Sequence, residues 1–215
     1  MGKGSGGTRG SAGGGGGAMA KAREEYDKYV HGGGFYDEIG ESFFGEKTEK
    51  QYEHMDALFQ PAKEDIVLYR GTSTEELNSI MDEAGISGND VNELVGKTFT
   101  STNFKSTTEQ KRYADDYASD VYDYSQKEFN SRDSRRNLSG NEEYNGKVLI
   151  RYEVAKGTPV VKRADVTDTI GRGAQHEHTI RRNVQMKVKS VTKKWDSLYD
   201  DRYEYELVIQ VGKKG

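Results

Sequence analysis

The chain has 215 residues, a length typical of one domain or slightly more, and sufficient to bury a sizeable core. Charged residues make up 32% and hydrophobic residues 33%, but 14 Tyr and 7 Phe supply the apolar bulk that disordered chains lack. The net charge of -4 gives no global field for nucleic acid or an anionic membrane, and the absence of Cys excludes disulfides, thiolate nucleophiles and Cys-based zinc sites.

The first 17 residues differ in composition from the rest, because ten of them are Gly. We interpret 1–17 as a flexible leader and 18–215 as one folded domain. GKGSGG satisfies G-x-G-x-x-G, but no strand precedes it, so a pyrophosphate cradle is not indicated. The sequence also lacks a long apolar run and the apolar core of a signal peptide, so we expect no membrane partner and a place in the cytoplasm of the producing or target cell.

The first half of the chain predicts helices. Strong helix formers favour a helix over 18–30, and the spacing of the apolar residues predicts another over 46–59 that ends before Pro61. Capping-box signatures, each followed by an apolar helical face, occur at Ser73 with Glu76 and at Ser106 with Glu109. Among these helices, 66–69 is a short apolar run typical of a buried strand.

The second half predicts strands. Residues 123–146 are polar and contain a small basic cluster, which indicates a loop or an insertion. Apolar residues then alternate with more polar ones over 148–154, 184–188 and 203–211. Helices followed by strands favour an α+β domain in which helices pack on antiparallel sheets.

Three segments point to a function by their order. They are LYRGT at 68–72, FTSTN at 99–103 and QHEHTI at 175–180. Together they resemble the mono-ADP-ribosyltransferase family, in its clostridial C3-like and cholera-like branch. That branch has an Arg ending one strand, an aromatic-x-Ser-Thr-Ser on a second and a [Glu/Gln]-x-Glu on a third. The resemblance covers about residues 20–212 and implies the ADP-ribosyltransferase fold, a helical N-terminal lobe with two antiparallel β-sheets forming an NAD cleft.

The chemistry of NAD cleavage suits these residue types. Breaking the bond between nicotinamide and ribose builds positive charge on the sugar, which the Glu177 carboxylate is suited to stabilise. A guanidinium recognises a pyrophosphate through paired hydrogen bonds, which fits Arg70. The resemblance implies that the Gly71 backbone holds the nicotinamide amide, and that Ser101, supported by Thr102, holds Glu177 and the Arg strand in register. NAD is the expected substrate, with no metal.

The position two residues before Glu177 is informative about the acceptor. In an extended segment Gln175 and Glu177 point to one face, and His176 and His178 point to the other. By the resemblance, Gln at this position implies an Asn or Gln amide, or a nucleobase, rather than an Arg side chain. The expected partner is therefore a macromolecular acceptor, protein or nucleic acid. Asn103 stands where the family has its second Ser.

The sequence also leaves other functions, and other roles for single residues, open. An NAD glycohydrolase uses the same Arg70, Ser101 and Glu177 with water as acceptor. An interaction protein, such as a phage virion component, can retain the fold without activity, and a secreted toxin is equally compatible. Arg70 alone is more often an ion-pair partner than a ligand. His176 and His178 form an H-x-H, but no third metal ligand lies near them in sequence, which favours a packed pair.

Overall fold

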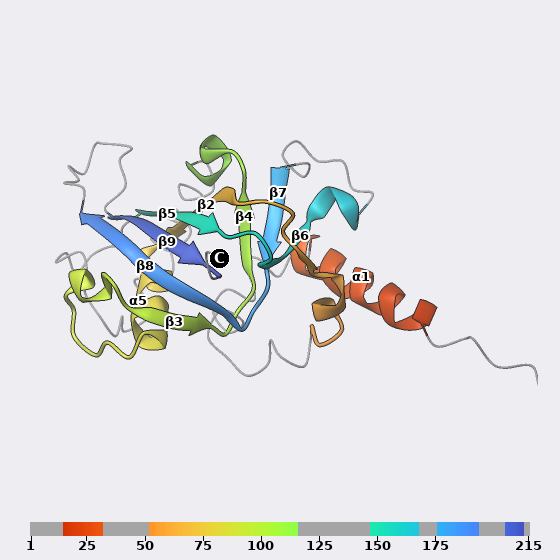
Figure 1. The fold of residues 1–215 in the computed structure, drawn as a ribbon, viewed down its shortest axis with the longest axis horizontal. Coiled ribbons are helices and arrows are strands. Elements are labelled where there is room, and N and C mark those ends of the chain that lie inside the picture. The colour runs from red at the N-terminus through yellow and green to blue at the C-terminus, as the bar shows by residue number, and fades with distance from the viewer. Residues whose placement is uncertain (1–14, 32–51, 116–146, 168–175, 194–204, 213–215) are drawn as a thin grey trace, which may run out of the picture.

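The computed structural model describes residues 15–31, 52–115, 147–167, 176–193 and 205–212 (Figure 1). Its elements, in chain order, are α1 (Gly15–His31), η1 (Met55–Leu58), β1 (Gln60–Pro61), β2 (Ile66–Ser73), α5 (Thr74–Glu83), η2 (Val91–Leu94), β3 (Thr98–Ser101), β4 (Lys105–Thr108), β5 (Lys147–Val154), β6 (Pro159–Lys162), η3 (Arg163–Asp165), β7 (Glu177–Ile180), β8 (Val184–Lys193) and β9 (Tyr205–Val211). The expected α+β class is confirmed.

The nine strands form one hydrogen-bonded sheet in the order β1-β6-β7-β4-β2-β5-β9-β8-β3. The two expected antiparallel sheets are joined here into one continuous ladder, in which β5 pairs with β9 in parallel. The expected division into two sheets corresponds to a position in this sheet where two neighbouring strands are only weakly paired. β2 and β4 share one register pair, Tyr69↔Thr108, whereas β2 and β5 share eight. We call this β2–β4 pairing the junction, and the strands on its two sides the β4 half and the β5 half.

The sheet is strongly curled. β3 ends the strand order and β4 lies in its middle, yet only residues 102–104 connect them in the chain. Because three residues span little more than about 10 Å, the sheet has to bend until these two strands approach each other. Figure 1 shows β3 passing directly into β4 below the other strands. The curl brings α1 and α5 to different parts of the sheet.

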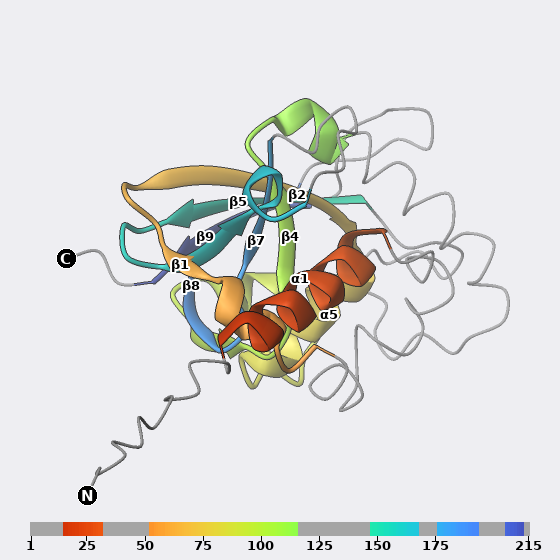
Figure 2. The ribbon, with the colours of Figure 1, turned by 90° about the vertical axis from the view of Figure 1, so that its right-hand side faces the viewer.

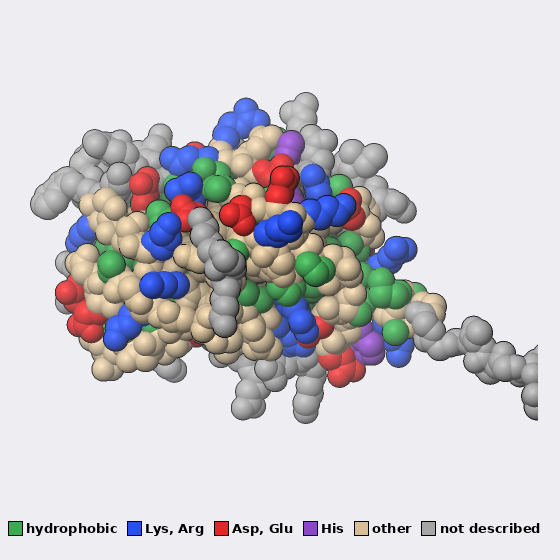
Figure 3. Space-filling view, viewed as in Figure 1, with side chains coloured by type: hydrophobic (Ala, Val, Ile, Leu, Met, Phe, Trp, Pro, Cys, Tyr) green, Lys and Arg blue, Asp and Glu red, His purple; other side chains and the backbone are tan. Residues whose placement is uncertain are grey.

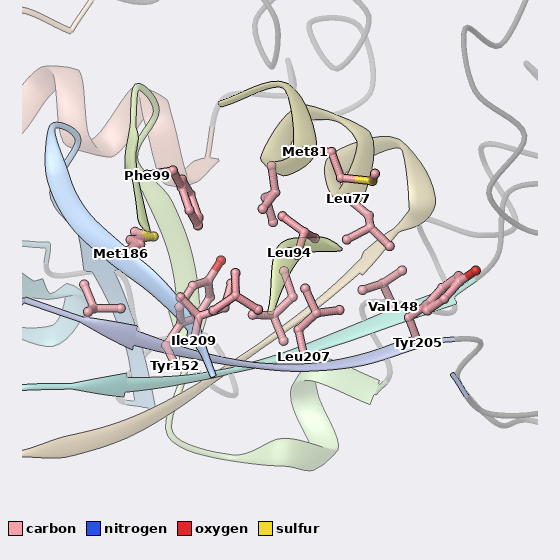
Figure 4. Packing of buried hydrophobic residues seen from close by; sticks show 14 of the residues in the cluster. Leu77, Met81, Leu94, Phe99, Val148, Tyr152, Met186, Tyr205, Leu207 and Ile209 are labelled. Atoms are coloured by element: carbon pink, nitrogen blue, oxygen red, sulfur yellow. The ribbon is translucent and has the colours of Figure 1, made fainter. Parts of the chain in front are cut away.

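The largest apolar core lies between the β5 half and the segment that contains α5 and η2 (Figure 4). Leu77 and Met81 from α5 and Leu94 from η2 face the strands. The strand residues come from the alternating runs that the sequence indicates, and those labelled in Figure 4 are Phe99, Val148, Tyr152, Met186, Tyr205, Leu207 and Ile209. Period-two alternation puts these residues on one face of the sheet, which explains why their strands were predictable.

A second, more aromatic cluster lies between α1, η1 and the β4 half. α1 crosses in front of the lower end of β4 (Figure 2). Ala22 and Tyr26 of α1 are buried here, and Phe59 and Phe104 stack with ring centroids 5.4 Å apart. The helix predicted over 18–30 is thus present, and it begins earlier, at Gly15, within the Gly-rich segment.

The helix predicted over 46–59 is shorter where the structure describes it. Residues 52–54 form a turn, and η1 is a single 3-10 segment. The Glu25 carboxylate of α1 accepts the backbone N–H groups of His54 and Met55, at 2.8 and 2.9 Å. This contact with a distant residue caps the short helix. The spacing of the residues near the helix does not predict it. The predicted burial of Met55 and Phe59 is nevertheless confirmed.

Both predicted capping boxes are only partly correct. α5 follows Ser73 as expected, but the Glu76 carboxylate binds Arg70 and Lys105. Ser106 lies inside β4, and the next helical turn begins only at Lys111. Glu76 and Glu109 instead contact side chains from the strands, so neither completes the predicted capping box.

Several predicted features lie outside the described residues, namely 1–14 of the leader, 46–51, the 123–146 segment and Gln175. Within the part that is described, none of the helices has the length and hydropathy that a membrane span requires. On the face shown in Figure 3, basic and acidic side chains are interspersed over the strands, in keeping with the small net charge.

Candidate active site

Arg70 occupies the β5 side of the junction. By strand alternation it points to the same face of β2 as the buried residues Leu68 and Thr72. The guanidinium Nε donates to Glu76 Oε2 at 2.8 Å, and one Nη donates to the carbonyl oxygen of Ser106 at 2.9 Å. Arg70 therefore bridges α5 and β4 at the point where the two halves of the sheet meet.

A second cation shares the Glu76 carboxylate. Lys105 of β4 donates to Glu76 Oε1 at 3.1 Å, and the exposed side-chain fractions of Arg70, Glu76 and Lys105 are 5%, 3% and 3%. Burial alone raises the pKa of the Glu76 carboxyl, but the two cations and a Thr72 hydrogen bond outweigh burial and lower it to about 2. Arg70, Glu76 and Lys105 therefore form a triad of two positive charges and one negative charge.

Glu177 begins β7 on the other side of the junction. Its side chain is 39% exposed and forms a short ion pair with Arg163 of η3. Burial raises the pKa of the Tyr26 phenol, and the charges of Glu177 and Arg163 also act on it, so these groups are neighbours. His178 contacts Glu109 instead. The predicted alternation of Glu177 and His178 between the two faces is confirmed.

The register places Arg70 and Glu177 close together across the sheet. Thr108 of β4 is the register partner of Tyr69 in β2 and of Glu177 in β7. Arg70 follows Tyr69, so its backbone lies two strand spacings from Glu177, about 10 Å. The junction thus brings together residues that are more than a hundred positions apart in the sequence.

A pair of hydroxyls on β4 and β7 contacts α1. Ser106 of β4 and Thr179 of β7 are register partners. Ser106 donates to the Tyr29 hydroxyl at 3.0 Å, and Thr179 shares a 3.2 Å hydrogen bond with the Tyr26 hydroxyl. Because the two tyrosines are three residues apart on α1, they project from one side of the helix. The helix is thereby fixed against the site strands.

The structure corrects the expectation that Ser101 holds Glu177 and the Arg strand. Ser101 lies on β3, at the far end of the strand order, and its hydroxyl donates to the carbonyl of Asn103 at 3.1 Å. Thr102 is exposed and donates both its backbone N–H and its hydroxyl to Glu83 of α5. Neither side chain is at the junction.

The residues at the expected place are Ser106 and its neighbours. Phe104 to Thr108 reads FKSTT, which also fits an aromatic-x-Ser-Thr pattern, with Thr108 in the position where Asn103 was a mismatch. β4, unlike β3, lies between the Arg70 and Glu177 strands. The mismatch at Asn103 was therefore a signal in the sequence against 99–103, the first of two consecutive candidate segments.

Two further predicted residues have different outcomes. Gly71 is buried within β2 and pairs with Leu149 of β5, and Gln175 lies outside the described residues. Sequence reasoning missed Glu76 and Arg163. Glu76 matched a capping pattern, and Arg163 follows a short strand in a segment without a recognisable motif.

The chemistry of this arrangement fits a dinucleotide with a ribose that loses its base. Two guanidinium groups flank the junction, and guanidinium is well suited to phosphate oxygens. A half-exposed carboxylate between them suits a sugar hydroxyl and a developing cation. The exposure of Glu177 contrasts with the burial of Arg70 and Glu76.

Comparison with known proteins supports the ADP-ribosyltransferase class that the sequence resembles. The sequence matches no protein-family model, and no curated protein matches it significantly. The structure, however, is similar to Plx2a, an ADP-ribosyltransferase toxin from Paenibacillus larvae, with a TM-score of 0.51 and 14% identity over 90% of this chain and 86% of that one.

Two further solved structures agree. The C3 exoenzyme of Clostridium limosum has a TM-score of 0.51 and 12% identity over 90% of this chain and 86% of that one. A C3 protein from S. aureus, solved with NAD, has a TM-score of 0.50 and 12% identity over 91% of this chain and 88% of that one. The chain has the ADP-ribosyltransferase fold.

Proposed function

We propose that this protein is an NAD-dependent mono-ADP-ribosyltransferase that modifies a macromolecular acceptor. The observation that carries the proposal is the placement of Arg70 and Glu177 on either side of the junction, two strand spacings apart, in a chain with the ADP-ribosyltransferase fold. Ser106 lies on the strand between them, and Arg70 binds its carbonyl oxygen.

In the proposed reaction the bond between the nicotinamide nitrogen and ribose C1' breaks, and its electron pair leaves with nicotinamide. The ribose carries the resulting positive charge, which the ionised Glu177 stabilises from the 2'-hydroxyl side. An acceptor nitrogen then forms a bond to C1' and releases a proton. Arg70 and Arg163 bind the pyrophosphate, and Gly71 contributes backbone contacts to the nicotinamide amide.

The acceptor is proposed to be an amide or a nucleobase. The support is the residue type of Gln175, two positions before Glu177 in the sequence. An amide side chain donates and accepts hydrogen bonds, so it can orient an uncharged acceptor nitrogen with similar groups. A guanidinium acceptor is instead matched by a carboxylate at this position.

Incubation of the purified chain with NAD labelled on the adenylate, with and without bacterial and eukaryotic lysates, tests the proposed activity. We expect label on a discrete protein or nucleic-acid band, together with release of nicotinamide. Free ADP-ribose without a labelled band identifies a glycohydrolase instead. Absence of both products contradicts the proposal and favours an interaction protein.

Substitution Gln175→Ala tests the acceptor assignment. Glu177 still activates the ribose, so slow NAD hydrolysis continues, while transfer falls by about tenfold or more because the acceptor loses its hydrogen-bonding partner. The measurement is the ratio of labelled acceptor to released nicotinamide. An unchanged ratio excludes Gln175 from acceptor binding.

A further inference from the structure

Glu109, the residue that follows β4, lies between the two histidines that flank Glu177. Its Oε2 is 3.5 Å from Nδ1 of His176, and its Oε1 is 3.5 Å from Nε2 of His178. Its backbone N–H also donates to the carbonyl oxygen of His176 at 2.9 Å. One residue therefore contacts the chain immediately before and immediately after Glu177.

The contacts are on the face of β7 opposite Glu177. His178 and Glu109 lie on one face, whereas Glu177 pairs with Arg163 on the other. The ring of Tyr113 stacks on His176 with a centroid separation of 6.4 Å. Figure 3 shows histidine, acidic and basic side chains together on the surface at the upper end of β7. The groups on this opposite face thus contact the chain on both sides of Glu177 and leave its carboxylate partly exposed on the other face.

We propose that Glu109 is a positioning residue for Glu177, whose carboxylate bridges His176 and His178 and so fixes the direction of the Glu177 side chain. This inference rests on the proposed function. β7 starts only at Glu177, and His176 immediately before it lies outside the strand. A rotation of the peptide at this end of the strand moves the carboxylate away from the ribose, and small displacements of a reacting group cost large factors in rate.

The charges around the bridge explain why it does not serve a metal ion. Lys162 of β6 places its ammonium 3.6 Å from Oε1 of Glu109, the same oxygen that faces His178. A cation is therefore already beside the carboxylate. Among the described residues, no group of three His, Asp or Glu has an arrangement that could hold a metal.

The bridge also has a direct spectroscopic signature. Burial lowers the pKa of His178, Lys162 lowers it further, and Glu109, its own contact to the His176 carbonyl and Asp165 raise it. Removing the Glu109 charge therefore has to lower the His178 pKa. Arg112, 5.2 Å from the centroid of the Tyr113 ring that stacks on His176, is a further charged group near the cluster.

The experiment compares Glu109→Gln with Glu177→Gln and with Glu153→Gln, a matched control in which a Glu on β5 that pairs with Arg151 and Lys189 loses its charge. Nicotinamide release gives kcat and KM for NAD, thermal unfolding checks the fold, and NMR titration follows His178. We expect Glu109→Gln to lower kcat about tenfold with KM within twofold of the parent, an unchanged unfolding midpoint and a lower His178 pKa.

Glu109→Asp, which keeps the charge on a shorter side chain, should recover part of kcat and of the His178 pKa. A parental kcat in Glu109→Gln, with Glu177→Gln inactive, overturns the positioning role while leaving the proposed function intact. Full activity in Glu177→Gln, or an inactive parent, overturns the proposed function and this inference together. An unchanged His178 pKa in Glu109→Gln shows that the bridge does not form.

Discussion

The two halves of the sheet are built from different kinds of residue. In the β5 half the inward positions are apolar almost throughout, and they form one core with α5 and η2. In the β4 half the strands are four residues long or shorter, and their buried positions include Thr107, Thr108, His178 and Thr179. The first half provides most of the apolar core and contributes Arg70 at its edge, whereas buried polar groups are a larger share of the second.

This difference shows where a reactive site can be accommodated. A buried polar group is tolerated only when a partner satisfies it, so each hydroxyl and charge in the β4 half depends on a particular neighbour. Tyr26 and Tyr29 of α1 and Glu76 of α5 supply several of those partners. In the β5 half such contacts are concentrated at Arg70 and Thr72 of β2, next to the junction, and the rest of its buried face is mainly apolar.

The largest expected effect comes from breaking the charge contact between the halves. Glu76→Gln leaves Arg70 and Lys105 as two buried cations without a counter-charge, and should lower the free energy of unfolding by about 3–5 kcal/mol. Urea denaturation measures this loss, with Glu24→Gln as the control, because Glu24 pairs with Lys28 and its side chain is 66% exposed. A loss below about 1 kcal/mol, the value for an exposed pair, contradicts a stabilising triad.

The same residue gives a pH dependence with a definite sign. The pKa of Glu76 falls from 4.5 to about 2 on folding, so its contribution is complete above pH 4.5 and is lost as the pH falls towards 2. The stability difference between the parent and Glu76→Gln should therefore shrink over that window. A difference that stays constant down to pH 2 shows that Glu76 does not titrate there.

The next effect is on catalysis. Glu177→Gln should lower both transfer and NAD hydrolysis by about a hundredfold or more, because a neutral amide of equal volume cannot stabilise the developing cation. The unfolding midpoint should change little, since the side chain is 39% exposed. Nicotinamide release is the measurement, and activity within a few-fold of the parent removes Glu177 from the mechanism.

The same contrast explains which parts of the molecule could be predicted from the sequence. Strands of the β5 half were visible because one side of each is apolar, and that alternation is a local signal. β6 and β1 were missed, since four and two residues are too short to show a period. The pairing of β4 between β2 and β7 depends on contacts between residues far apart in the sequence, so no local pattern predicts it.

The site follows the same rule. Arg70 and Glu177 were found because each stands beside a strand-like run in a recognisable order. Glu76 was assigned to helix capping because Ser73 lies three residues earlier, and its real partners are known only once α5 is placed on the sheet. Ser101 was preferred to Ser106 although both follow an aromatic residue at the same spacing. Asn103 was a local sign against the first segment, and the strand order places Ser106, not Ser101, between the strands of Arg70 and Glu177.

A smaller effect is expected at the β5 side of the junction. Arg70→Lys keeps the charge next to Glu76 but cannot bind Glu76 and the Ser106 carbonyl with the fixed geometry of a guanidinium. Affinity for NAD should fall by about tenfold, together with turnover. Calorimetric titration with NAD tests this, and an unchanged affinity makes Arg70 a structural ion-pair partner only.

The smallest effect distinguishes the two serines. Ser106→Ala removes the hydroxyl that binds Tyr29 beside Arg70, and should lower kcat/KM for NAD by a few-fold, about 1 kcal/mol for one neutral hydrogen bond. Ser101→Ala is the matched control, because it removes a hydroxyl of equal size whose partner is the nearby Asn103 carbonyl. It should leave kcat/KM unchanged and cost only about 1 kcal/mol of stability. If Ser101→Ala instead impairs turnover while Ser106→Ala does not, β3 carries the functional serine, and the position of β4 between Arg70 and Glu177 has no catalytic meaning.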